Sequence, residues 1–237
     1  MKTIGLIGGM SWESTATYYR RLNELVKARL GGLHSARIAL YSVDFHEVER
    51  LQSQERWKDA AALMIAAAQR VEHAGADLLL LCTNTMHRVA EPLQAAVRVP
   101  LVHIGDPVAD AVHASGLRCV GLLGTRFTMA AGFLRDRIEH RGDLRVIVPA
   151  AADRERVDRV IFEELCQGRQ RAESRAAYRR IIAQLVHEGA QGIILGCTEI
   201  GLLIRDRDAT VPLFDTTELH CARAVELALE GEPDASG

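Results

Sequence analysis

The chain contains an internal repeat, and this feature restricts its fold more than any other. Residues 73–85 read HAGADLLLLCTNT and residues 187–199 read HEGAQGIILGCTE, so that His, Gly, Ala and the last Leu of an apolar run coincide. Two further pairs of segments match in the same order and at nearly the same offset: 4–9 with 120–125, and 99–101 with 211–213. Three ordered matches predict a duplicated structural unit.

The repeated segments are short apolar runs that alternate with longer segments of helical period. Parallel strands buried on both faces have this composition. Gly75 and Gly189 are placed to end two of the helices. The expected strands are 3–8, 37–43, 77–82, 99–102, 118–123, 144–148, 191–196 and 211–214, and the expected helices include 56–74, 106–115, 152–167 and 172–188. The alternation predicts an α/β fold with two pseudo-symmetric, doubly wound parallel-sheet domains.

The domain boundaries follow from the repeat. We expect the first α/β domain to comprise residues 1–98 plus 212–237 and the second to comprise residues 99–211. Ligands of doubly wound sheets bind beyond the carboxyl ends of the strands. The segments expected at those ends are 8–11, 83–85, 125–128 and 197–199. If a pseudo-twofold axis relates the halves, Thr83 and Cys197 are equivalent and face one ligand from opposite sides.

The composition argues against several classes of partner. Charged residues make up 25% of the chain and the formal net charge is -2, so neither nucleic acid nor a membrane surface is expected. No apolar run approaches the roughly 20 residues of a membrane span, and we expect a cytoplasmic protein. The five scattered cysteines include no C-x-x-C pair, which favours neither a disulfide framework nor a metal site.

Cys197 is the first candidate for chemistry. It ends an apolar strand and precedes a short expected helix over 198–204, whose dipole and free N–H groups would favour a thiolate. An inert core cysteine is the alternative. The polar Thr198 and Glu199 that follow, and the equivalent polar segment 83–85, favour a working thiol.

Polar residues also follow two other strands. Thr83, Asn84 and Thr85 could cap a helix, but three small polar groups in a row also suit a carboxylate ligand. His87 could orient this site or simply pack on its helix. Segment 8–11 lacks the G-x-G-x-x-G spacing of a dinucleotide site, so no dinucleotide cofactor is expected. The same turn, with Met10 and Ser11, suits a small anion, and Thr125 holds the equivalent place in the second half.

Four segments together resemble the aspartate/glutamate racemase family: GGMS at 8–11, NTMH at 84–87, GTRFT at 124–128 and LGCTE at 195–199. The resemblance spans nearly the whole chain and is greatest to the L-aspartate/glutamate-specific, broad-specificity amino-acid racemases. It implies two α/β domains with the active site between them, no pyridoxal phosphate, no metal and often a homodimer. It also implies proton transfer at the α-carbon of an amino-acid substrate, with two cysteines flanking that carbon. Donors such as Asn84, Thr85 and Thr198 would hold the substrate carboxylate.

The chain departs from this family at its first cysteine, where it has Thr83. Cys82 lies one residue earlier and should point to the other face of the strand, so we interpret it as structural. A local twist that brings Cys82 to the substrate is the alternative. The resemblance implies that the second cysteine of the family, here Cys197, removes the α-proton of the L-enantiomer. A hydroxyl is a poorer base than a thiol, so L-substrates should exchange their α-proton readily while D-substrates react poorly.

A second departure concerns the substrate side chain. Cys166 stands where aspartate-specific relatives carry a Lys, and Arg50 and Gln52 could replace that contact. Acidic amino acids are the first expectation and other polar amino acids the second. A single-thiol decarboxylase or isomerase on the same scaffold, or a binding protein without turnover, are the alternatives.

Overall fold

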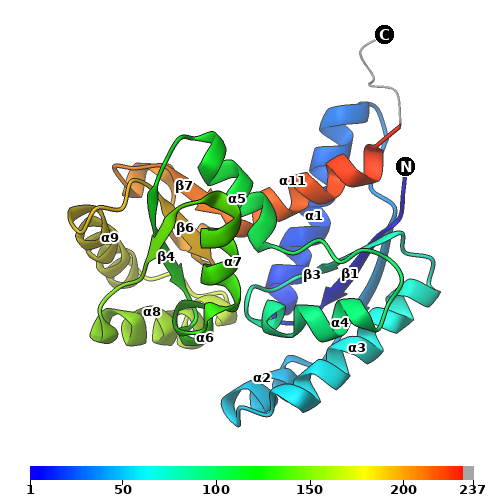
Figure 1. Ribbon diagram of the computed structural model, residues 1–237, viewed down its shortest axis with the longest axis horizontal. Helices are drawn as coiled ribbons and strands as arrows, with labels where there is room; N and C mark the ends of the chain where they lie inside the picture. The colour runs from blue at the N-terminus through cyan, green and yellow to red at the C-terminus, as the bar shows by residue number, and fades with distance from the viewer. Residues whose placement is uncertain (232–237) are drawn as a thin grey trace. The chain divides into compact units, whose positions relative to one another are not determined.

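The structure, a computed structural model, describes residues 1–231 and confirms the predicted alternation of strands and helices (Figure 1). Two wholly parallel sheets have the strand orders β2-β1-β3 and β5-β4-β6-β7, so β2-β1-β3 corresponds to β5-β4-β6, in agreement with the repeat. The strands are β1 (Ile4–Gly8), β2 (Ile38–Ser42), β3 (Leu78–Leu81), β4 (Cys119–Gly124), β5 (Arg145–Ile147), β6 (Ile193–Gly196) and β7 (Leu213–Asp215).

Helices connect these strands. The α-helices are α1 (Trp12–Leu30), α2 (Phe45–Ser53), α3 (Trp57–His73), α4 (Ala90–Ala95), α5 (Gly105–Ala114), α6 (Arg126–Ala130), α7 (Gly132–Gly142), α8 (Ala151–Glu163), α9 (Ala172–His187), α10 (Ile200–Leu203) and α11 (Thr216–Leu229). Three 3₁₀ helices are η1 (Thr85–Val89), η2 (Leu165–Gln167) and η3 (Asp206–Asp208). Across residues 1–231, none of these helices combines the length and the apolar character needed to cross a membrane.

The chain forms two compact units whose limits differ from the predicted domains. The first unit comprises Met1–His103 and the chain from His220 onward, and the second is Ile104–Leu219. Residues 99–103 stay with the first unit because Leu79 donates to the carbonyl of Pro100 at 2.9 Å and accepts from the N–H of Val102 at 2.9 Å. Strand β7, expected in the first domain, pairs with β6 in the second sheet. The last expected residues of the first domain, 232–237, lie outside the described residues.

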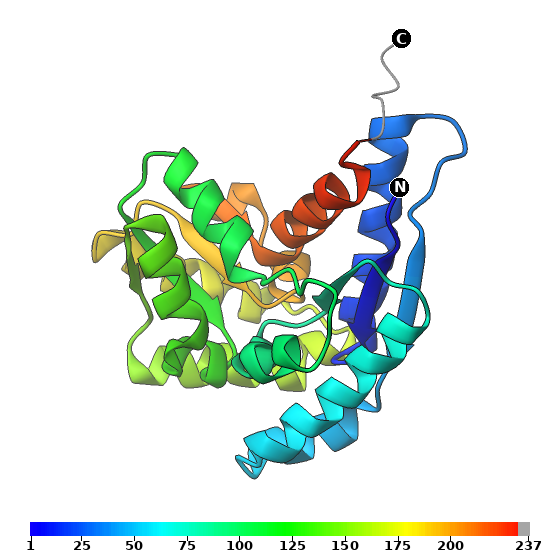
Figure 2. The ribbon, with the colours of Figure 1, turned by 45° about the vertical axis from the view of Figure 1, so that its right-hand side comes forward.

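The first sheet buries both of its faces, which explains why its strands lack a polar face. Ile7, Leu79 and Leu81 pack with α2, α3 and α4 in one apolar cluster. Their neighbours Leu6 and Leu80 point the other way and pack against α1 and α11. Figure 2 shows α3 on one side of β1 and α1 on the other. Successive side chains of a strand alternate between faces, so a wholly apolar run is required.

The second sheet has the same construction. Leu123, Ile193 and Leu195 pack against α8 and α9, whereas Leu122 and Ile194 pack against α5 and α7. The doubly wound architecture is therefore present in each unit.

Three local expectations have clear outcomes. Gly75 and Gly189 end α3 and α9 as predicted, with φ of +90° and +104°. The strand expected at 99–102 is reduced to a single bridge between Leu79 and Leu101, because Pro100 has no N–H for a ladder. The helix expected over 152–167 ends at Glu163, and η2 follows before Gly168 reverses the chain at φ +70°.

Candidate active site

Cys197 and Thr125 lie next to each other at the carboxyl edge of the second sheet, directly after β6 and β4. Gly196 and Gly124, the residues before them, pair directly between β6 and β4. A Cβ at Gly124 would lie 2.9 Å from the carbonyl oxygen of Gly196, so the close approach of these strands requires glycine. The two strands thus present a thiol and a hydroxyl at neighbouring positions.

Glu199 lies between two thiols. The Sγ of Cys197 donates to Oε2 of Glu199 at 2.9 Å, and the Sγ of Cys166 donates to the other oxygen, Oε1, at 3.7 Å. Cys197 and Glu199 are 8% and 4% exposed, whereas Cys166 is only half-buried. A carboxylate that contacts a buried thiol within hydrogen-bond distance is a ready acceptor for its proton.

The predicted thiolate at a helix N-terminus is not what the structure shows. Helix α10 begins at Ile200 and has four residues, so its dipole is small and Cys197 lies outside it. Burial, followed by the negative charge of Glu199, raises the pKa of Cys197 well above its ordinary value. A hydrogen bond from the backbone of Glu199 opposes this shift but is the weakest cause. Cys197 therefore rests as a protonated thiol.

The remaining predicted residues of the second unit hold this edge together. The hydroxyl of Thr217 donates to Oγ1 of Thr198 at 3.0 Å. Oγ1 of Thr125 accepts from the backbone N–H of Thr128 at 3.2 Å and so caps α6. Both Thr125 and Thr198 are 6% exposed. Sequence reasoning did not identify Thr217 because only the fold brings the start of α11 beside Thr198.

In the first unit, Thr83, Asn84 and Thr85 follow β3 at its carboxyl end. Cys82 is fully buried among apolar residues on the α1 and α11 face of the sheet, and this burial raises its pKa. Thr83 follows with 9% exposure and belongs to none of the apolar clusters. The structural interpretation of Cys82 agrees with this placement.

The turn after β1 is organised by its own side chains. Ser11 caps α1, with its Oγ accepting from the N–H of Ser14 at 3.2 Å. Gly9 has φ +92°, and its N–H donates to Oγ1 of Thr15 at 2.8 Å. That N–H is thus already used, which removes it from the anion-binding turn expected here. Met10 and Ser11 are buried at 5% and 3% exposure.

Gln52 and Arg50, both on α2, differ in their exposure to solvent. Gln52 is 3% exposed and donates from Nε2 to the Sδ of Met86 at 3.0 Å, directly beside Thr85. Arg50 is exposed to solvent. Of the two side chains considered for the substrate, the structure brings only Gln52 toward the segment that contains Thr83.

His87 belongs to a buried histidine cluster that the sequence did not reveal. Its ring lies 4.6 Å from that of His103 and 5.7 Å from that of His220, between centroids. Nδ1 of His87 donates to the carbonyl of Thr83 at 2.8 Å. Burial, then the neighbouring His103 and His220, lower the pKa of His87 well below its ordinary value, so the ring is neutral. His87 therefore anchors the backbone of Thr83.

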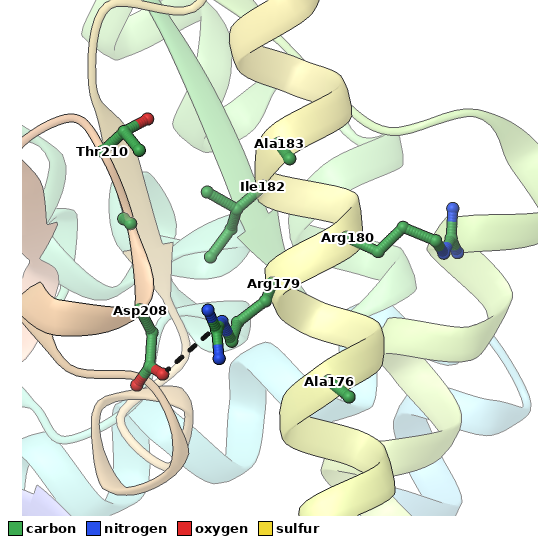
Figure 3. A pocket seen from close by; sticks show the side chains of 8 residues that line it. Ala176, Arg179, Arg180, Ile182, Ala183, Asp208 and Thr210 are labelled. Carbon is green, nitrogen blue, oxygen red and sulfur yellow. Dashed lines mark ion pairs between the residues drawn. The ribbon is translucent and has the colours of Figure 1, made fainter.

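A cavity of about 400 Å³ lies elsewhere in the second unit, between α9 and the chain around η3 (Figure 3). Arg179 on α9 pairs with Asp208 at 3.9 Å across it. The lining residues are Ala176, Arg179, Arg180, Ile182, Ala183, Asp208, Ala209 and Thr210. None of the predicted site residues lines this cavity.

Comparison of the sequence with models of known protein families identifies the family of this chain. The family described as Asp/Glu/hydantoin racemase matches residues 7–224. The chain belongs to the Asp/Glu/hydantoin racemase family. It is therefore an isomerase of the racemase class, as predicted from the four segments near Cys197, Thr83, Thr125 and Ser11.

Two solved structures resemble this racemase over nearly its whole length, and a further relative matches 72% of it. A candidate Asp/Glu racemase from Yersinia pestis is 54% identical with a TM-score of 0.90, and the match covers 97% of this chain and 100% of that one. An aspartate racemase homologue from Pyrococcus horikoshii is 38% identical with a TM-score of 0.83, covering 96% and 99%. A glutamate racemase from Shewanella loihica is 28% identical over 176 residues, which are 72% of this chain and 63% of that protein.

The chemistry of a racemase sets the requirement for this site. A proton must leave the α-carbon on one face and a proton must arrive on the other. Among the predicted catalytic residues, the racemase has a thiol with an adjacent carboxylate, at Cys197, and a hydroxyl at Thr83. The two predicted catalytic groups are therefore chemically unequal.

Proposed function

We propose that this racemase acts on L-aspartate and L-glutamate without a cofactor, with Cys197 as the base that removes the α-proton and Thr83 on the opposite face. The observation that carries the proposal is the 2.9 Å hydrogen bond from Cys197 to Glu199. Relatives named for aspartate and glutamate support the acidic substrate.

The base must be formed before it can work, because Cys197 rests as a thiol. Shifting the thiol proton to Oε2 of Glu199 leaves a thiolate without sending charge to solvent. The thiolate then takes the α-proton, the C–H bond breaks, and an S–H bond forms. Glu199 is the group best placed for this step, since it is 4% exposed and in contact with Cys197.

The substrate carboxylate needs donors that stabilise the carbanion as it develops. Asn84, Thr85 and Thr198 carry such donors at the carboxyl ends of β3 and β6. The other predicted substrate contacts are Met10, Ser11, Gln52, Thr125 and Glu199. The corresponding positions of β3 and β6 in their sheets support a shared role for Thr83 and Cys197.

Thr83 makes the proposed reaction one-sided. An alcohol is a far weaker acid than a thiol and is therefore seldom present as the alkoxide that could abstract an α-proton. L-substrates, which react with Cys197, should exchange their α-proton quickly, whereas D-substrates depend on Thr83 and should react slowly.

Proton exchange in heavy water tests the proposal directly. We would follow the loss of the α-proton signal of L- and D-aspartate and L- and D-glutamate by NMR, with Cys197→Ala as control. We expect fast loss from the L-enantiomers, slow loss from the D-enantiomers, and no loss in the variant. Equal rates from both enantiomers would refute the role of Thr83. Turnover of malonate-type acids without any exchange would instead indicate a decarboxylase.

A further inference from the structure

Cys197, Glu199 and Cys166 form a row of contacting side chains that runs from a buried thiol to a half-buried one. Cys197 is 8% exposed, Glu199 is 4% exposed, and Cys166 is half-buried, so the three groups lead from the buried thiol toward solvent. Each oxygen of the carboxylate has its own thiol, Oε2 that of Cys197 and Oε1 that of Cys166. A carboxyl group bonded in this way can accept a proton on one oxygen and release one from the other.

The segment that leads into the turn carrying Cys166 is held against α9 by two polar contacts. Before it, Val157 of α8 accepts from the hydroxyl of the fully buried Tyr178 at 3.1 Å. Next to it, the carboxylate of Glu164 accepts from the hydroxyl of Ser174 at 2.7 Å. Both donors lie on α9, so η2 is fixed against this helix and Cys166 is kept at Glu199.

We propose that Cys166 is a positioning residue that connects Glu199 to solvent, forming the outer end of a proton relay for Cys197. The inference rests on the proposed function of Cys197 as the base. It gives Cys166 a role other than that of the Lys in aspartate-specific relatives, since a thiol supplies no positive charge. The residues involved face each other within the second unit alone.

The relay balances atom by atom. After the α-proton has moved to Cys197, the carboxyl group of Glu199 still holds the proton that it first took from Cys197. The carboxyl group turns about its Cγ–Cδ bond and gives that proton to the sulfur of Cys166, and the thiol of Cys197 then gives the α-proton to the carboxylate that remains. Cys166 in turn releases its own proton to a solvent water. The reverse sequence brings a solvent proton to Cys197, which returns it to the same face of the carbanion. The net result is exchange of the α-proton with solvent.

Two readouts separate proton removal from proton exchange. Exchange of the α-proton of L-aspartate in heavy water requires the relay, because the proton on Cys197 must be replaced before it returns. A single turnover of HCl elimination from a 3-chloro derivative of L-aspartate, measured with enzyme in excess, requires only removal of the α-proton. Loss of chloride then makes the step irreversible, and the proton on Cys197 need not leave the enzyme within that turnover. A relay residue should affect the first rate and leave the second unchanged.

Cys166→Ala in the full-length protein tests the relay. We expect about a tenfold slower exchange, an unchanged elimination rate and partial rescue of exchange in Cys166→Ser, which keeps a proton-carrying group. Cys119→Ala removes another half-buried thiol of the same unit and should change neither rate. Equal loss of both rates in Cys166→Ala would show a structural role and overturn the proposal, as would unchanged exchange. If the wild-type protein neither exchanges nor eliminates, the proposed function itself fails.

Discussion

The Sγ atom of Cys197 lies 2.9 Å from Oε2 of Glu199, and both side chains are almost fully buried. The carboxylate has two opposing effects on the thiol. Its charge helps to raise the pKa of Cys197 and keeps the proton on sulfur, while its proximity supplies the acceptor that removes this proton. The two effects can be separated by a substitution that keeps the shape of Glu199.

Glu199→Gln should make the thiol of Cys197 more reactive toward alkylating reagents but less able to exchange the α-proton of the substrate. Removing the negative charge lowers the pKa of Cys197 toward its ordinary value, so alkylation by iodoacetamide at pH 8 should be faster than in wild type. Loss of the proton acceptor should reduce α-proton exchange about 100-fold. Mass spectrometry of the peptide containing Cys197, with Cys119 as internal reference, gives the labelling rate. Slower labelling together with unchanged exchange would contradict this role.

Thr83→Cys should restore the missing thiol. A thiol at this position could act as a base toward D-substrates, so we expect α-proton exchange of D-aspartate to rise by at least about tenfold, with little change for L-aspartate. Thr83→Ser retains a hydroxyl and should keep the wild-type asymmetry. A folded Thr83→Cys protein with no gain on the D-enantiomer would argue against Thr83 as the second catalytic position.

The fold could be predicted from the sequence because a sheet that is buried on both faces requires strands that are apolar at every position. Leu79 and Leu80 point to opposite sides of the first sheet, and each side is covered by helices, so both positions must be apolar. The repeat then indicated that there are two such sheets. The boundary between the two units was harder to predict from the sequence. It depends on whether a strand such as β7 pairs with β6, and the local pattern of apolar and polar residues does not determine strand pairing.

Part of the candidate site could likewise be predicted from the sequence, and part of it could not. Cys197 and Thr83 could be chosen because polar residues interrupt apolar runs at repeated positions. The contact between Cys166 and Glu199 could not, since the turn at η2 reaches α10 only in the folded unit. The pKa of Cys197 is raised, whereas the expected helix would have lowered it. The prediction assumed a longer helix and omitted the charge of Glu199.

Ser11 offers a way to distinguish helix capping from substrate binding. Ser11→Ala removes the acceptor for the N–H of Ser14 and should lower the free energy of unfolding by about 1 kcal/mol. Ser11→Asp keeps a capping oxygen and should retain that stability, but its charge would repel a substrate carboxylate and raise KM. Urea unfolding and racemisation kinetics measure the two effects. An unchanged KM in Ser11→Asp would remove Ser11 from the substrate site.

His87 should make the first unit sensitive to acid. Its pKa is lowered in the folded protein, so the unfolded chain binds a proton more readily as the pH falls below the ordinary value of 6.5. The contribution of a neutral His87 to stability is complete above pH 6.5 and is lost as the pH falls toward its folded pKa. For one proton, the slope is at most about 1.4 kcal/mol per pH unit.

His87→Gln provides the test, since the amide can still donate to the carbonyl of Thr83 but cannot titrate. We expect the free energy of unfolding of wild type to fall between pH 7 and pH 5, and the variant to fall less steeply. His103 and His220, which face His87, remain in both proteins and supply a common background. Identical slopes for His87→Gln and wild type would show that His87 does not titrate on unfolding and would reject this origin of acid sensitivity.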